Sequence, residues 1–305
     1  MAEAYLLAGA TATGKSAVVH CLAEADGAAV LSADSMLVYR GMDIGTAKPS
    51  AAERAAVPYF GIDLATPDEP FSTGKWLEAA EAAFRQSGRP LYITGGTGLY
   101  FKALTEGLDG PGATLERRHY WQAFLEEQGI DALAEEIRRR WPAAFATLDD
   151  PRNPRRLTRA AEMLELTGAL PDSWRRQGPR TPLPALFMPR EALHARIARR
   201  VETMFRQGLV EEVEALRAAY PVWSETARKA IGYAEVCAWL DGQCSQEEAK
   251  RRIIVRTRQL AKRQETWFRH QADVVWIELC GDEPVESVAA RVREVWRKYG
   301  RATIR

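Results

Sequence analysis

A glycine-rich segment near the start of the chain constrains the fold more than any other feature. It reads Gly9-Ala10-Thr11-Ala12-Thr13-Gly14-Lys15-Ser16, which matches the G-x-x-x-x-G-K-[ST] spacing of a phosphate-binding loop (P-loop). The apolar run Tyr5–Ala8 before it predicts a strand, and the residues from Lys15 to about Glu24 predict a helix. In that context the backbone N–H groups of the loop face an anion at the positive end of the helix. Lys15 adds a positive charge, and the Ser16 hydroxyl can ligate Mg²⁺.

Two further short strands indicate the fold class. The run Ala28–Leu31 leads into Asp34, and Pro90–Thr94 ends on Gly95-Gly96-Thr97-Gly98. Strands that alternate with helices predict an α/β fold, a P-loop NTPase-like parallel sheet flanked by helices. Ligands of such sheets bind beyond the carboxyl ends of the strands, so we expect the P-loop, Asp34 and Thr97 on one rim.

The residues around this rim do not decide which reaction the site catalyses. An ATPase or kinase needs an acidic residue that holds the metal at the end of a strand, but Gly95–Gly98 follows the third strand instead. Asp34 can take that place, or it can act as a general base or cap a helix.

The middle of the chain has a different character. Breaks rich in Gly and Pro occur at Gly110-Pro111-Gly112 and at Gly178–Pro184. The sequence between them predicts two charged amphipathic helices, Thr114–Trp141 and Pro154–Thr167, and Gly168 can end the second. We therefore predict a catalytic core made of residues 1–111 and 184–305 and a helical insertion domain at residues 112–183.

Two long helices are expected in the second part of the core. Apolar residues at helical spacing from Glu191 to Leu216 predict one of them. Ser245-Gln246-Glu247-Glu248 reads as a capping box that opens another, which runs to about His270 and is rich in Arg and Lys.

Composition narrows the class of protein. The chain has 305 residues and a net charge of +1, but residues 1–109 hold 8 Lys or Arg against 13 Asp or Glu, and residues 151–200 hold 11 Arg against 4 acidic residues. Such asymmetry is typical either of a bound polyanion or of well-solvated helices. The 4 scattered cysteines and the absence of a long apolar run predict a cytoplasmic protein with no membrane span.

Several motifs together resemble the bacterial tRNA dimethylallyltransferases, also called tRNA isopentenyltransferases. The likeness covers nearly the whole chain and rests on Gly9–Ser16, Asp34–Pro49, Gly95–Leu104, Gly208–Val213, Ala230–Tyr233 and Thr257–Phe268.

The resemblance implies a reaction and roles for residues. The dimethylallyl group of dimethylallyl diphosphate moves to N6 of the adenosine 3′ to the anticodon, with Mg²⁺ as cofactor. Asp34 is the implied general base, Thr97 a hydrogen-bond partner of the reacting groups, and Arg118 a further candidate in the insertion. The diphosphate is held by the loop residues Gly9, Ala10, Thr11, Ala12, Thr13, Gly14, Lys15 and Ser16, with Ser16 also on the metal, and by Arg200.

The resemblance also implies contacts with the tRNA anticodon stem-loop, whose target base must be flipped out to reach a buried site. They map to Asp34, Ser35, Met36 and Leu37; to Arg155, Arg156, Leu157, Thr158 and Arg159; to Lys229, Gly232 and Tyr233; and to Lys262, Arg263, Gln264, Trp267 and Arg269. Trp267 and Phe268 can stack on bases or pack in the core. Leu37 replaces a glutamine that is common in the family, which puts one hydrogen bond to the target adenine or its neighbours in doubt.

Other functions fit part of the pattern. An adenylate isopentenyltransferase, which uses AMP or ATP, shares the P-loop and the base but does not need the basic insertion. A P-loop kinase or a non-catalytic RNA-binding module is the remaining alternative. We expect a monomer.

Overall fold

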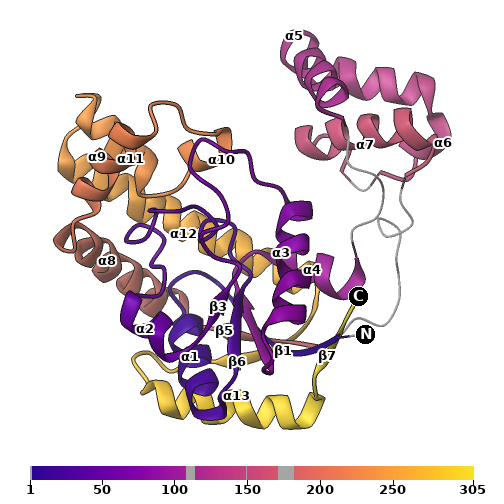
Figure 1. Cartoon of the computed structure of the whole chain (residues 1–305). Coiled ribbons are helices and arrows are strands. Elements are labelled where there is room, and N and C mark those ends of the chain that lie inside the picture. The colour runs from indigo at the N-terminus through magenta and orange to yellow at the C-terminus, as the bar shows by residue number, and fades with distance from the viewer. Residues whose placement is uncertain (1, 108–113, 149, 171–181) are drawn as a thin grey trace. The chain divides into compact units, whose positions relative to one another are not determined.

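The chain forms two compact units in the computed structural model, which describes residues 2–107, 114–148, 150–170 and 182–305 (Figure 1). The core unit comprises Met1–Glu106 and Arg180–Arg305, and the inserted unit comprises Gly107–Pro179. The predicted breaks at Gly110–Gly112 and Gly178–Thr181 lie outside the described residues.

Both predicted boundaries of the insertion differ in the structure, since Gly107, assigned to the core, belongs to the inserted unit. Pro182 and Leu183, assigned to the insertion, begin strand β5 (Pro182–Phe187) of the core, where Pro182 pairs with Asp273 and Leu183 with Val274. Prolines usually interrupt a sheet because they lack an N–H donor. Here the burial of Leu183, Ala185 and Leu186 in the core offsets that loss.

The core is built on a sheet of seven strands whose order is β3-β2-β4-β1-β5-β6, with β7 beside β1. All pairs are parallel except β1 with β7. This confirms the predicted parallel sheet. The strands other than β5 are β1 (Ala2–Gly9), β2 (Ala29–Ser32), β3 (Tyr59–Phe60), β4 (Leu91–Gly95), β6 (Asp273–Glu278) and β7 (Ala302–Ile304).

Helices cover both faces of the sheet (Figure 1). Leu6 and Leu7 are adjacent in β1 and enter opposite faces, because side chains alternate along a strand. Leu7 packs with α1 (Lys15–Asp26) and α13 (Val285–Tyr299), and Leu6 packs with α3 (Thr73–Gln86), α4 (Gly98–Glu106) and α12 (Gln246–Gln271). Of the elements named so far, the sequence did not predict β3, β5, β6, β7, α3, α4 and α13.

The long helix predicted from Glu191 is two helices, α8 (Arg190–Arg206) and α9 (Leu209–Ala219). Gly208 separates them with a φ of 99°, in the left-handed region that glycine adopts at little cost. Because of this break, the buried apolar residues form two stripes on differently oriented helices. The short helices α2 (Ala51–Ala56), α10 (Glu225–Arg228) and α11 (Tyr233–Leu240) complete the core unit.

The inserted unit contains α5 (Leu115–Arg140), α6 (Pro142–Phe145) and α7 (Pro154–Thr167). It has its own hydrophobic core, centred on Trp121, Leu133 and Ile137. Gly168 ends α7 with a φ of 72°, as predicted. In the part of the chain that the structure describes, no helix is both long and apolar enough to cross a membrane.

Candidate active site

A cavity of about 390 Å³ lies beyond the carboxyl ends of β1, β2 and β4, in the core unit. This volume suits a small ligand. The P-loop, Asp34 and α8 all contribute to its wall. Its lining residues are Thr11, Ala12, Gly14, Lys15, Ser16, Val30, Ser32, Asp34, Leu37, Ile44, Thr46, Ala47, Pro49, Tyr59, Thr94, Gly95, Arg196, Arg200, Thr203, Met204 and Gln207.

The P-loop has the conformation of an anion-binding loop. Ala12 and Gly14 have φ values of 65° and 91°, and α1 starts directly after Gly14. The Thr13 hydroxyl and the Lys15 ammonium both donate to the Ala10 carbonyl, at 2.9 and 3.2 Å. These bonds hold the loop open at the N-terminus of α1, where the helix dipole favours a negative charge.

Among the described residues, three cationic side chains line the cavity against a single carboxylate. Burial lowers the pKa of Lys15 to about 8, although Asp34 opposes the shift. Burial also lowers the pKa of Arg200, whose guanidinium donates to the Thr46 carbonyl (3.2 Å) and lies 3.4 Å from the Thr11 hydroxyl. Cations taken out of water need an anion, so this site suits a diphosphate.

The third cation, Arg196, was not among the predicted site residues. A Cβ atom on Gly14 would lie 2.9 Å from its Nη2 atom, so the Arg196 guanidinium lies directly against the P-loop. Arg196 and Arg200 are four residues apart in α8 and therefore share one face of the helix. This four-residue spacing is the sequence feature from which Arg196 could have been predicted as a site residue once Arg200 was assigned.

The Asp34 carboxylate enters the cavity from a loop that other groups hold in place. Its Oδ1 accepts the Met36 N–H at 2.9 Å, and no helix begins there, which excludes the helix-cap alternative. Thr97 acts on this loop. Its hydroxyl accepts the Ser35 N–H at 3.0 Å, and its N–H donates to the Ala33 carbonyl at 3.1 Å. Thr97 does not line the cavity; its two hydrogen bonds hold the backbone of Ala33 and Ser35, the residues on either side of Asp34.

The donor set for Mg²⁺ is small. Ser16 and Asp34 both line the cavity, and the described residues contain no group of three or more His, Cys, Asp or Glu that could hold a metal. Mg²⁺ commonly takes one or two protein oxygens and completes its shell with phosphate oxygens and water. The residues present therefore fit a metal that arrives with a diphosphate.

The predicted tRNA-binding residues range from exposed to buried, and seven are half-buried: Asp34, Ser35, Met36, Leu37, Arg159, Gln264 and Trp267. Six basic ones are exposed: Arg155, Arg156, Lys229, Lys262, Arg263 and Arg269. Leu157, Thr158 and Tyr233 are buried, so their side chains are not available to RNA in this structure. Leu157 and Thr158 lie on the inner face of α7, whose outer face carries Arg155 and Arg156, a distinction that a motif alone does not make.

Other candidates have defined partners. Arg118, on α5 of the inserted unit, lies 3.9 Å from Glu162, and Arg159 donates to the same carboxylate at 3.0 Å. Gln264, on α12, accepts the Thr11 N–H of the P-loop at 2.8 Å. Gln264 therefore supports the P-loop wall of the cavity. Leu37 lines the cavity with an apolar side chain.

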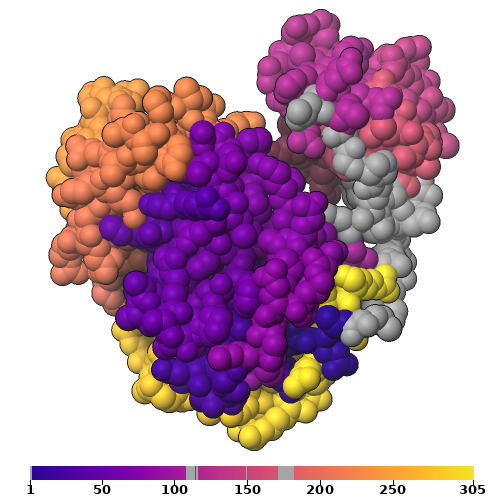
Figure 2. Space-filling view, in the orientation of Figure 1, coloured from indigo at the N-terminus to yellow at the C-terminus, as the bar shows by residue number. Residues whose placement is uncertain are grey.

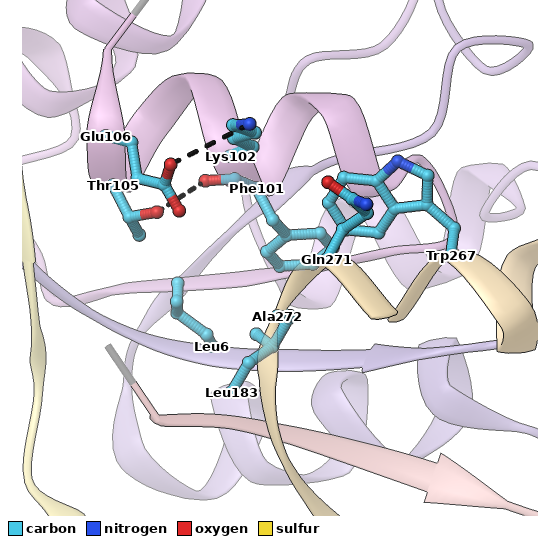
Figure 3. A pocket seen from close by; sticks show the side chains of 9 residues that line it. All are labelled: Leu6, Phe101, Lys102, Thr105, Glu106, Leu183, Trp267, Gln271 and Ala272. Carbon is cyan, nitrogen blue, oxygen red and sulfur yellow. Dashed lines mark hydrogen bonds and ion pairs between the residues drawn. The ribbon is translucent and has the colours of Figure 1, made fainter. Parts of the chain in front are cut away.

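Trp267 and Phe268 differ in environment. Phe268 is fully buried beside Phe101, which confirms core packing for this residue. The ring of Trp267 lies over Gly98, where a Cβ would approach it to 2.0 Å. Trp267 also borders a second pocket of about 20 Å³, with Lys102 and Glu106 paired at 4.0 Å (Figure 3). That volume holds about one water molecule, so it is no substrate site.

The parallel sheet, the P-loop and a cavity with three cations and one carboxylate define a P-loop protein with an anion-binding site. Comparison with known proteins gives the family. The IPP transferase model matches residues 37–271, and the isopentenyl transferase model matches residues 2–58. The chain belongs to the IPP transferase family.

Named relatives cover almost all of the chain. It is 39% identical to a tRNA dimethylallyltransferase of Geobacter metallireducens (90% of this chain, 92% of the relative) and 41% identical to one of Rhizobium meliloti (90% and 94%). The crystal structure of a tRNA isopentenylpyrophosphate transferase of Bacillus halodurans matches with a TM-score of 0.69, 34% identity and coverage of 97% and 96%. These matches agree with the α/β fold and the enzyme class that the sequence predicts.

Proposed function

We propose that this enzyme transfers the dimethylallyl group of dimethylallyl diphosphate to N6 of the adenosine 3′ to the anticodon of tRNA. One observation carries the proposal: the Asp34 carboxylate lines the same cavity as the P-loop, Lys15, Arg196 and Arg200. The general base therefore lines the same cavity as the three cations Lys15, Arg196 and Arg200, which we call the diphosphate clamp. The names of the relatives support tRNA as the acceptor.

The residues divide the chemistry between them. N6 of adenine forms a bond to C1 of the dimethylallyl group as the C1–O bond breaks, and the electron pair of that bond leaves with the diphosphate. Asp34 accepts the N6 proton, a role worth about 10²–10⁴ in rate. Lys15, Arg196 and Arg200 stabilise the charge that develops on the leaving group. Mg²⁺, when bound at Ser16, supplies further positive charge to the diphosphate oxygens.

The RNA side of the proposal rests on the exposed basic residues. Arg155 and Arg156 on α7, with Lys262 and Arg263 on α12, offer charge to the phosphates of an anticodon stem-loop. The target adenosine is flipped into the cavity, where Leu37 gives it an apolar contact. We further propose that the enzyme acts as a cytoplasmic monomer.

An acceptor assay separates this function from its alternatives. The enzyme is given labelled dimethylallyl diphosphate and Mg²⁺ with unmodified tRNA, AMP or ATP in parallel. We expect label in tRNA only. Label in AMP or ATP would show an adenylate isopentenyltransferase, and ATP turnover without prenyl transfer would show a kinase.

The Asp34→Asn variant tests the base. Because the amide cannot accept the N6 proton, kcat should fall by about 10²–10⁴ while the Kd for tRNA changes less than about threefold. Asp68→Asn, at an exposed position outside the cavity, is the matched control. A near-normal kcat in Asp34→Asn would remove Asp34 from the mechanism.

A further inference from the structure

The loop Asp43–Ala47 forms part of the cavity wall and touches the diphosphate clamp. Ile44, Thr46 and Ala47 line the cavity, and the Thr46 carbonyl accepts a hydrogen bond from Arg200 Nη2 at 3.2 Å. The direction of the Arg200 guanidinium therefore depends on where this loop lies.

Glu212 on α9 holds the loop by its backbone. Its carboxylate accepts the N–H groups of three consecutive residues: Asp43 at 3.1 Å, Ile44 at 2.8 Å and Gly45 at 3.4 Å. A charged acceptor makes these bonds stronger than bonds between neutral groups. In Figure 2, the orange surface of α9–α11 adjoins the indigo-to-violet surface of the first part of the chain.

Tyr233 on α11 completes the arrangement. Its side chain is fully buried, its hydroxyl donates to Glu212 Oε1 at 2.5 Å, and the hydroxyl oxygen accepts the Gly45 N–H at 3.2 Å. Burial and the Glu212 carboxylate raise the pKa of Tyr233, so the hydroxyl keeps its proton. A Cβ on Gly45 would lie 2.4 Å from the Tyr233 ring, so only glycine allows this approach.

Lys48, the residue after the loop, adds a second anchor. The fully buried Lys48 ammonium lies 2.6 Å from Asp43 Oδ1 and 2.7 Å from Asp63 Oδ1, and it donates to the Tyr39 carbonyl. Lys48 anchors the loop to the core, and Glu212 with Tyr233 sets its position on the side of the helices.

We propose that Glu212 and Tyr233 are positioning residues of the diphosphate clamp: they fix the Asp43–Ala47 loop and, through the Thr46 carbonyl, aim the Arg200 guanidinium at the diphosphate. This inference rests on the proposed function. It also changes the expected role of Tyr233, from a tRNA contact to a support of the donor site.

Steady-state kinetics of Glu212→Gln and Tyr233→Phe test the proposal. We expect the KM for dimethylallyl diphosphate to rise on the order of tenfold in Glu212→Gln and less in Tyr233→Phe, with the KM for tRNA within about twofold of the wild type. Glu211→Gln, exposed on the same helix, and Tyr220→Phe are the matched controls and should leave both constants unchanged.

A double-mutant cycle with Arg200→Ala separates positioning from a general loss of structure. If Glu212 acts through Arg200, its effect on the donor KM should largely disappear in the Arg200→Ala background. An unchanged donor KM in both single variants, an effect on the tRNA KM instead, or full additivity with Arg200→Ala would overturn the proposal. Failure of the wild type to transfer the dimethylallyl group would instead refute the proposed function. Should Glu212→Gln not fold, Tyr233→Phe decides alone.

Discussion

At the scale of single residues, the site is defined by an imbalance of charge. Among the described residues, Lys15, Arg196 and Arg200 are the cations of the cavity wall, and Asp34 is its only carboxylate. Burial destabilises the charged forms of Lys15 and Arg200, as their lowered pKa values indicate. The diphosphate of the proposed function would remove that cost by pairing with both cations.

This imbalance predicts a pH dependence of donor binding. Because burial lowers the Lys15 pKa to about 8, the ammonium of the free enzyme loses its proton as the pH rises through that value. The kcat/KM for dimethylallyl diphosphate should therefore fall above about pH 8. In Lys15→Ala, kcat/KM for dimethylallyl diphosphate should be low at every pH and should show no fall near pH 8. A wild-type kcat/KM that stays constant to high pH would contradict the assignment of this fall to Lys15.

At the scale of secondary-structure elements, α12 supports the site through its C-terminal half. Its Gln264 binds the Thr11 N–H, and its Trp267 packs on Gly98 at the start of α4. The contact is close because Gly96 and Gly98 have no side chains: a Cβ on Gly96 would lie 2.3 Å from Gln264 Nε2. The glycines that follow β4 therefore let α12 reach the P-loop.

Replacing Gly98 tests this packing. A Cβ at Gly98 would come within 2.0 Å of the Trp267 ring, so Gly98→Ala should destabilise the protein by about 1–3 kcal/mol, measured by urea unfolding. Gly74→Ala in α3 is the control, since its Cβ would have only the Ser72 hydroxyl within 4 Å, at 3.7 Å, and alanine favours a helix. Equal free energies of unfolding for the two variants would show that α12 can move away from the added Cβ without loss of stability.

At the scale of the whole molecule, the two units have separate hydrophobic cores, and the basic residues proposed to bind tRNA occur in both. Arg155 and Arg156 on α7 are exposed, whereas Leu157 and Ala161 on its other face fill the core of the inserted unit. One helix therefore stabilises its unit and presents charge to a polyanion.

The salt dependence of tRNA binding follows from this charge. Affinity should fall steeply as salt rises, because each interaction with a phosphate group releases counterions. Replacing Arg155 and Arg156 together by alanine should reduce the slope of log K against log salt by about 0.7 for each phosphate that is no longer neutralised. Arg138→Ala, which removes an exposed arginine paired with Glu135, should leave the slope unchanged. A wild-type affinity for tRNA that does not change with salt concentration would contradict the proposal that these exposed basic residues bind tRNA phosphates.

Local patterns were enough to predict the parallel sheet, the P-loop and the place of Asp34 beside it: strand runs, glycine spacing and the rule that ligands bind at strand ends. The motifs also predicted Arg200 and the family.

Which side chains face the cavity depends on long-range packing, which the sequence does not reveal. Arg196, Gln264 and Glu212 act through partners up to 253 residues away in the chain, as for Gln264 with Thr11, and no local pattern reports such a distance. For the same reason Tyr233 and Leu157, inside motifs that implied RNA contact, proved to be buried. A motif predicts that a segment is needed, whereas packing determines the direction of each side chain.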